Sequence, residues 1–444
     1  MDLLKDRVKN LFFRYLSAAF GSALVSSIYG VVDLAVVGRY EGANGAAALA
    51  VVAPVWNIIY SLGLLTGIGG SVIFSAKRGG QSSQSDDENQ IFTASVAYSV
   101  VLALVSWVLL AVFEAPVLRF FGADDDLLSL AQTYLRPVLV VLPVFLFNQM
   151  LAAFLRNDGA PGLATAAVLT GGIFNVFGDI FCVFTLDMGI YGAGLATAIG
   201  ACLSCCVMLM HFVSKKNTLR LVKTAQIGKK CLDISAAGFS SFFIDVAMGI
   251  LTVLFNRQIM RLQGTDALAV YGCLINVSTF VQCCAYSVGQ AAQPILSMNY
   301  GAGQPKRIRE TLRYALLTAA VMSAFWTLLS LLVPNLYVHL FMTPTDGVLA
   351  IAPMMIRRYA LSFLLLPFNI FSTYYFQAIL RPQSAFVVSV GRGLVISGVL
   401  IFVLPWLFGA ESLWFAMPIT ELLTAVYAAA EMKKSTAALP EKAA

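Results

Sequence analysis

Charged residues are scarce in this chain. They make up 12% of its 444 residues, whereas soluble domains carry about 25%. Hydrophobic residues account for 59%, and the mean hydropathy is +0.81. So few charges cannot cover the surface of a water-soluble protein of this length, and lipid is the solvent that tolerates so much outward-facing apolar area. The composition therefore excludes a soluble protein and predicts an all-α integral membrane protein.

Histidine is nearly absent. The two histidines, His211 and His339, stand alone near the ends of apolar runs. A nucleophile, a base and an orienting residue therefore cannot be assembled into a catalytic set. A membrane enzyme acting on lipid is one alternative, but it would need a catalytic cluster at the membrane interface, and none appears in the sequence. We expect a protein that is not an enzyme, carries no cofactor and binds no nucleic acid.

A cleavable signal peptide and a zinc motif are also missing. The first apolar stretch runs from about Leu11 to Val37, which exceeds the roughly 7–15 residues of a signal h-region and predicts a membrane span. The run Cys202-Leu-Ser-Cys205-Cys206 has no partner pair at zinc spacing. We interpret these cysteines as small apolar packing residues.

Long apolar runs are what the chain has instead. A helix needs about 20 apolar residues to cross a bilayer, and we count twelve runs of at least that length. Their approximate bounds are 12–38, 46–76, 91–113, 127–152, 160–185, 189–213, 234–260, 267–297, 312–333, 348–377, 384–408 and 411–432. Several exceed the minimum, so we expect those helices to tilt or to extend beyond the membrane.

The positions of lysine and arginine predict the orientation. If the N-terminus is inside, most of the 29 basic residues fall on inner segments, and only Arg39, Arg119, Arg257 and Arg261 fall on outer ones. Basic residues accumulate in short cytoplasmic loops. We therefore predict a multi-pass protein of the bacterial cytoplasmic (inner) membrane with both termini in the cytoplasm.

A long basic loop divides the chain near its middle. It covers residues 214–233 and predicts an N-terminal lobe over 1–213 and a C-terminal lobe over 234–444. A shift of 222 residues aligns Arg39 with Arg261 and Gly42 with Gly264. Six helices per half give both halves the same orientation, so we expect two six-helix lobes related by a pseudo-two-fold axis along the membrane normal. A cavity between such lobes is the usual place for a substrate.

Four acidic residues fall inside predicted spans and away from the span ends, two of them in the N-terminal half. Ionisable groups in lipid are costly, so they are candidates for function. Asp33 and Asp179 lie at similar depth, with Asn175 one turn before Asp179 and Thr197 about two turns into the next helix. These hard oxygen donors suit Na⁺ or a proton and suit no soft metal. The alternative is that both aspartates are helix-end residues facing water.

The other two acids lie in the C-terminal half. Asp245 and Glu421, together with Arg392, are candidates for a substrate cavity. Arg392 and Glu421 could instead pair with each other, which would give both a structural role.

Two stretches resemble the multidrug and toxic compound extrusion (MATE) family. One is Val31-Val-Asp33-Leu-Ala-Val-Val-Gly38-Arg39 followed by Gly42. The other is Gln293-Pro294-Ile-Leu-Ser-Met-Asn299-Tyr300-Gly301-Ala-Gly303 leading into Lys306-Arg307. The resemblance extends over nearly all of the chain, including the two sets of six helices.

This resemblance implies export of organic cations and other amphipathic compounds in exchange for H⁺ or Na⁺, by lobes that alternate between inward- and outward-open states. It also implies an ion-coupling site at Asp33, Asn175, Asp179 and Thr197, which match one branch of the family in type, order and spacing. Two features depart from other members. No proline occurs between Leu11 and Val37, so a proline-driven bend of the first helix is not expected. Helix ten has no acid, so a coupling pair in helices seven and ten is not expected either.

The resulting hypothesis is a monomeric antiporter, coupled to H⁺ or Na⁺, that exports small organic compounds and whose partners are those substrates and membrane lipids. A flippase for a lipid-linked saccharide precursor is the alternative, but it predicts a cationic central cavity, and Arg392 is the only basic residue expected deep in that cavity. Neither the substrate nor the coupling ion is fixed by the residues.

Overall fold

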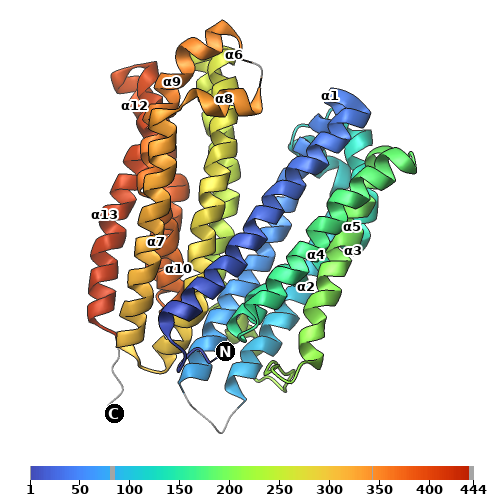
Figure 1. The fold of residues 1–444 in the computed structure, drawn as a ribbon. Coiled ribbons are helices and arrows are strands. Elements are labelled where there is room, and N and C mark those ends of the chain that lie inside the picture. The colour runs from blue at the N-terminus through green and yellow to red at the C-terminus, as the bar shows by residue number, and fades with distance from the viewer. Residues whose placement is uncertain (1, 81–85, 343, 440–444) are drawn as a thin grey trace. The chain divides into compact units, whose positions relative to one another are not determined.

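The structure, a computed structural model, describes residues 2–80, 86–342 and 344–439. The two ends predicted to be cytoplasmic, Met1 and residues 440–444, lie outside this range. The described residues form helices joined by short connections, and no strand occurs among them (Figure 1). The predicted all-helical class is confirmed.

The N-terminal half begins with a very long helical stretch. The helices are α1 (Val8–Gly79), α2 (Asp87–Phe120), α3 (Asp125–Asn157), α4 (Pro161–Ile180) and α5 (Gly189–Leu209). The residues at their starts explain two of the boundaries. The side chain of Asp124 caps α3 by accepting a hydrogen bond from the backbone N–H of Leu127 at 2.9 Å. Pro161 opens α4, where its missing N–H costs nothing.

The C-terminal half repeats this plan with more interruptions. Its helices are α6 (Ile227–Gly301), α7 (Pro305–Leu332), α8 (Asn335–Phe341), α9 (Asp346–Ala360), α10 (Leu366–Ala378), α11 (Pro382–Val390), α12 (Ile396–Phe408) and α13 (Ala416–Ala437). A 3-10 turn joins α9 to α10, and a π turn over Gly391–Val395 joins α11 to α12. Each joined pair is therefore one membrane span.

Glycine kinks divide α1 and α6. Gly42 has φ 71° and ψ −153°, and Gly264 has φ 81° and ψ −166°, a conformation that side chains disfavour. At 1.5 Å per residue, the 75 residues of α6 would extend about 110 Å, several times the roughly 30 Å hydrocarbon core. Eleven candidate spans are found in the described residues with α6 taken as one. Dividing α6 at Gly264 gives the twelve spans that the sequence predicts.

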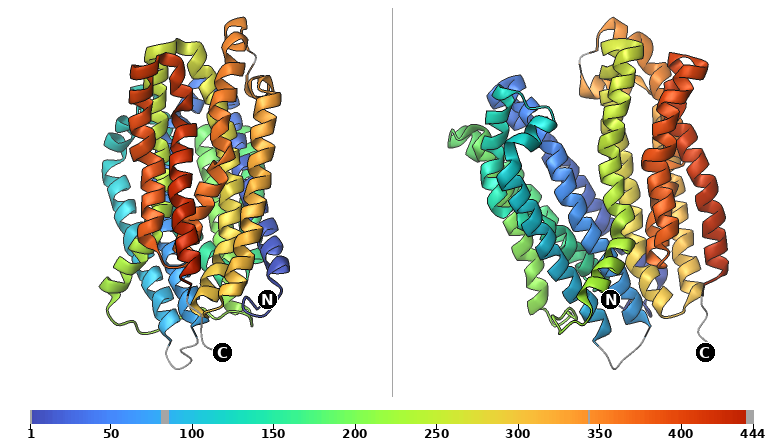
Figure 2. Two further views of the ribbon diagram at one scale, coloured as in Figure 1. Left: turned by 90° about the vertical axis from the view of Figure 1, so that its left-hand side faces the viewer. Right: turned by 180° about the vertical axis from the view of Figure 1, so that it is seen from behind.

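The chain forms two compact units. Unit 1 contains Ser17–Phe242, and unit 2 contains Leu3–Leu16 with Phe243 onward. In unit 2 the first turns of α1 pack into a core with α6 and α10, and Phe12 and Tyr15 are fully buried there. The side chain of Arg307 donates to the backbone oxygen of Leu3 at 3.0 Å. In the same unit α12 and α13 run side by side (Figure 2). The lobe boundaries at 213 and 234 remain a prediction.

A buried carboxylate holds several segments together at one end of unit 1. Asp158, in the connection between α3 and α4, accepts from Arg78 at 2.5 Å and lies 2.7 Å from Nε2 of His211. The backbone N–H of Thr218 donates to it at 3.0 Å, and the Thr218 hydroxyl donates as well. Burial would raise the pKa of Asp158, but these hydrogen bonds and the Arg78 charge together hold it below its ordinary value of 3.8. His211 is thus paired, which its isolation in the sequence did not indicate.

Candidate cation site

Asp33 lies on the first half of α1, in unit 1, and is bonded to a residue that the sequence analysis did not select. The hydroxyl of Tyr134 on α3 donates to Oδ2 of Asp33 at 3.1 Å. Tyr134 is 2% exposed and belongs to an apolar cluster with Val36, Val37 and Ile190. The packing of α3 against α1 and α5 therefore fixes where this hydroxyl lies.

The other three predicted residues meet across α4 and α5. The side-chain amide of Asn175 donates to Oδ1 of Asp179 at 3.3 Å and to Oγ1 of Thr197 at 3.0 Å. The Tyr134 hydroxyl also lies 3.5 Å from Oγ1 of Thr197. The structure thus brings all four predicted residues into one hydrogen-bonded chain, with Tyr134 joining Asp33 to the rest.

Small residues allow this meeting. A Cβ atom on Gly171 of α4 would lie 2.6 Å from the backbone oxygen of Gly200 on α5, and one on Gly178 would lie 2.9 Å from the Cβ of Ala196. Both distances are shorter than van der Waals contact, so only glycine lets the two backbones come this close. Asn175 stands between these two glycines, which is why its amide reaches Thr197.

Three oxygens of the site are buried without a partner. Oδ1 of Asp33, Oδ1 of Asn175 and Oδ2 of Asp179 accept no hydrogen bond from any described residue. Burying an acceptor unsatisfied is costly, and such atoms are uncommon in native proteins. Neither aspartate forms an ion pair among the described residues. Two carboxylates and an amide oxygen are the donor set of a hard cation, and they fit Na⁺ or a proton.

Glu421 and Arg392 pair in unit 2. Nε of Arg392 lies 2.7 Å from Oε1 of Glu421, which is fully buried. The amide of Asn369 on α10 donates to Oε2 of Glu421 at 2.6 Å and to its backbone oxygen at 2.8 Å. The pairing that the sequence left open is therefore present, and each buried charge has a counter-charge.

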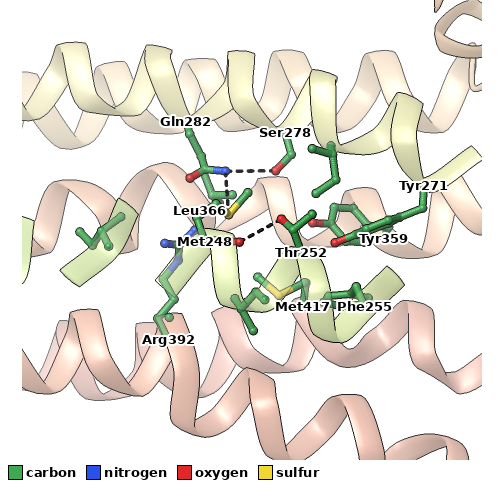
Figure 3. A pocket seen from close by; sticks show the side chains of 14 residues that line it. Met248, Thr252, Phe255, Tyr271, Ser278, Gln282, Tyr359, Leu366, Arg392 and Met417 are labelled. Carbon is green, nitrogen blue, oxygen red and sulfur yellow. Dashed lines mark hydrogen bonds between the residues drawn. The ribbon is translucent and has the colours of Figure 1, made fainter. Parts of the chain in front are cut away.

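Arg392 also lines a small cavity within unit 2 (Figure 3). Polar groups on its wall include Gln282, whose amide donates to Ser278 at 3.3 Å, and Thr252. The cavity holds about 20 Å³, which is room for about one water. Asp245 is half-buried on α6 next to the lining residue Ile244. A role for Asp245, Arg392 and Glu421 in substrate binding remains a prediction.

The chain is similar to known transporters over nearly its whole length. The MatE family model matches residues 18–181 and 239–403. The multidrug export protein MepA of Staphylococcus haemolyticus is 24% identical over 408 residues, covering 91% of this chain and 89% of that protein. MepA of Staphylococcus saprophyticus is 23% identical over 410 residues, with the same coverage.

Solved structures share the fold. A multidrug resistance MATE family transporter of the MOP superfamily, in an outward-facing conformation, superposes with a TM-score of 0.87 at 19% identity. A MOP superfamily transporter from Pyrococcus furiosus, described as having a binding pocket of reverse polarity that suggests a different function, superposes with a TM-score of 0.89 at 20% identity. Each match covers 98% of both chains. At these identities the superpositions establish the fold alone.

Proposed function

Since this chain belongs to the MatE family of multidrug exporters, we propose that it is an antiporter, coupled to H⁺ or Na⁺, which exports small cationic or amphipathic organic compounds. We further propose that it works as a monomer in the bacterial cytoplasmic membrane, without a cofactor and with both termini in the cytoplasm. The basic residues of the loops support this orientation.

The observation that carries the proposal is the donor set in unit 1. Asp33 and Asp179 contribute two carboxylates, and three oxygens of the site have no partner among the residues that the structure describes. If these residues had only a structural role, we would expect every buried acceptor among them to receive a hydrogen bond. An incoming cation would neutralise one carboxylate and satisfy the unpaired oxygens, so the site changes state when the ion binds.

The available driving force is sufficient for export. One proton supplies about 1.4 kcal/mol per pH unit, and one charge supplies about 2.3 kcal/mol per 100 mV. Together these would support roughly a 500-fold gradient of a neutral substrate. Exchange of one proton for a singly charged cation is electroneutral, so for such a substrate the pH gradient alone acts and supports about a tenfold gradient per pH unit. Binding of the ion from outside would lower the affinity for the exported compound, and release of the ion inside would restore it.

The flippase alternative receives less support. A carrier of lipid-linked phosphates needs unpaired positive charge in its cavity, whereas Glu421 neutralises Arg392 at 2.7 Å. The same pairing leaves no excess positive charge at this place for an anionic headgroup.

The test is ethidium efflux from proteoliposomes with pH and Na⁺ gradients imposed one at a time. We expect efflux under an inward gradient of one of these ions and none without a gradient. Efflux that proceeds without either gradient would contradict the antiport mechanism. A protein that moves no dye but reorients a fluorescent lipid-linked saccharide would support the flippase instead.

A further inference from the structure

A groove on unit 2 lies outside the site described above. It has a volume of about 430 Å³ and opens at the molecular surface. Its walls come from the start of α7, from α10 and from the end of α13, and the residues that matter here are Arg309, Leu316, Phe368, Met432 and Lys433. The start of α7 and the end of α13 lie at the same end of the unit (Figure 1). Its volume is within the range of small-ligand sites.

Two unneutralised bases stand at this groove. Arg309 and Lys433 are both exposed, and neither forms an ion pair or hydrogen bond with another described residue. Glu431, two residues before Lys433 on α13, is already committed to Arg381 at 3.6 Å and Ser384 at 3.2 Å. Glu310 follows Arg309 but does not line the groove. The groove therefore has a positive rim, and none of the described residues that form its wall is acidic.

Apart from Thr436, the rest of the wall is apolar and continues into exposed apolar surfaces of α7 and α13. On α7, the row that begins at Arg309 passes the exposed Arg313 and continues through Leu317, Val321 and Phe325, which are 58–62% exposed. On α13, Leu422 and Val426 are 53% and 65% exposed and precede Ala429 and Lys433 on the same face. A ligand with its charge at the rim would therefore find exposed apolar side chains on both helices for its hydrocarbon part.

We propose that this groove binds one anionic phospholipid of the inner leaflet, with the phosphate between Arg309 and Lys433 and the acyl chains along α7 and α13. Basic pockets between helices at the cytoplasmic side are suited to anionic headgroups. The leaflet rests on the proposed orientation, in which the loops rich in Lys and Arg are cytoplasmic. The lipid would lie on the surface of unit 2, and the proposal does not require a transported substrate to enter the groove.

The experiment is native mass spectrometry of the full chain in detergent, titrated with phosphatidylglycerol or phosphatidylcholine. The wild type should retain one phosphatidylglycerol much more strongly than phosphatidylcholine. Arg309→Gln with Lys433→Gln should weaken that binding about 30-fold, which is the equivalent of about 1 kcal/mol per base. The matched control is Lys306→Gln with Lys434→Gln, which removes two exposed bases from the same helix ends outside the groove wall. It should bind as the wild type does.

A second variant tests the groove without changing charge. Leu316→Trp should fill the apolar wall and also weaken retention, so the proposal remains testable if the charge variant fails to fold. Equal affinity for phosphatidylcholine, or an unchanged affinity in both groove variants, would overturn the proposal. Displacement of the lipid by glycerol 3-phosphate would also overturn the proposal, because it would indicate a site for free phosphate. A measured mass that corresponds to two copies of the chain, instead of one chain with one bound lipid, would overturn it as well. Since no transport is measured, these outcomes are independent of the antiport hypothesis.

Discussion

The hydroxyl of Tyr134 lies 3.1 Å from Oδ2 of Asp33 and 3.5 Å from Oγ1 of Thr197. This one side chain from α3 connects the acid on α1 with the polar residues on α4 and α5. The charge state of Asp33 is therefore linked through a hydrogen bond to the helices that carry Asp179. In the proposed mechanism, an ion that binds at Asp33 would therefore also affect the residues on α4 and α5.

Tyr134→Phe should change ion coupling without abolishing transport. The hydroxyl stabilises the empty, charged form of Asp33, so its removal should let the coupling ion bind more tightly. A hydrogen bond to a charged group contributes about 1.5–3 kcal/mol, and less where solvent compensates. We expect the ion concentration for half-maximal efflux to fall roughly 5- to 10-fold, measured with ethidium in proteoliposomes.

The control is Tyr337→Phe, which removes a buried hydroxyl bonded to Ser330 at 2.8 Å on another part of the chain. It should leave the ion dependence unchanged. Identical ion dependence in Tyr134→Phe and the wild type would show that the hydroxyl has no part in coupling.

Much of the site was predictable from the sequence, because an acid or amide inside an apolar run is conspicuous. The sequence predicts Asp33, Asn175, Asp179 and Thr197 by type and depth; the last three are hydrogen-bonded to one another, and Tyr134 joins Asp33 to them. Tyr134 could not be predicted as part of the site, because tyrosine is common in apolar helices and its partner, Asp33, lies 101 positions away in the sequence. Asn369 was missed for the same reason: its link to Glu421 depends on how α10 packs against α13.

Glu421→Gln should destabilise unit 2 strongly. It leaves the buried guanidinium of Arg392 without its counter-charge, a change that costs about 3–5 kcal/mol. Replacing both residues, Arg392→Met with Glu421→Leu, should recover most of the loss, because well-packed apolar residues often substitute for a buried ion pair. Thermal unfolding in detergent measures the stability of the single and the double variant.

The exposed pair of Arg358 and Glu411, 2.8 Å apart, provides the comparison. Glu411→Gln should change stability by at most about 1 kcal/mol. If Glu421→Gln is no worse than Glu411→Gln, the structural role of the buried pair is wrong, and a direct role in substrate binding becomes the better interpretation.

Gly171→Ala should separate α4 from α5. The added methyl group would meet the Gly200 oxygen at 2.6 Å and would overlap Oγ of Ser204, so we expect a loss of about 1–3 kcal/mol together with reduced efflux. Gly162→Ala is the control on the same helix, since nothing lies within 4 Å of its added carbon. Equal melting temperatures and efflux in the two variants would contradict the close contact of α4 and α5.

Asp158→Asn should lower stability at neutral pH but not in acid. Because the folded pKa of Asp158 lies below 3.8, its carboxylate stabilises the fold above about pH 4, and this contribution is lost as the pH falls through the folded value. We expect the difference in melting temperature between wild type and variant to be full at pH 7 and to shrink below about pH 4.

The matched comparison for Asp158 is Asp125→Asn, at the exposed pair with Arg119. It should change the melting temperature little at any pH. A difference for Asp158→Asn that stays constant down to pH 3 would mean that the carboxylate charge is not what holds Arg78, His211 and Thr218 together.

The fold was also partly predictable. The apolar runs indicated twelve spans, and the alignment at a shift of 222 residues paired Gly42 with Gly264, the two glycines at which the long helices are kinked. The kinks follow from residue type, because glycine tolerates positive φ. The assignment of Leu3–Leu16 to the same unit as α10 was not predictable, because it depends on the packing of Phe12 and Tyr15 rather than on composition.

The most direct test measures ion-driven ethidium efflux by Asp33→Asn and Asp179→Asn, beside Asp125→Asn as the control at an exposed acid. All three proteins should insert and purify like the wild type. We expect both site variants to lose efflux under every imposed gradient, because an amide cannot supply the charge that the cation neutralises, and we expect Asp125→Asn to retain it. Normal ion-driven efflux by Asp33→Asn would contradict the assignment of cation coupling to this site.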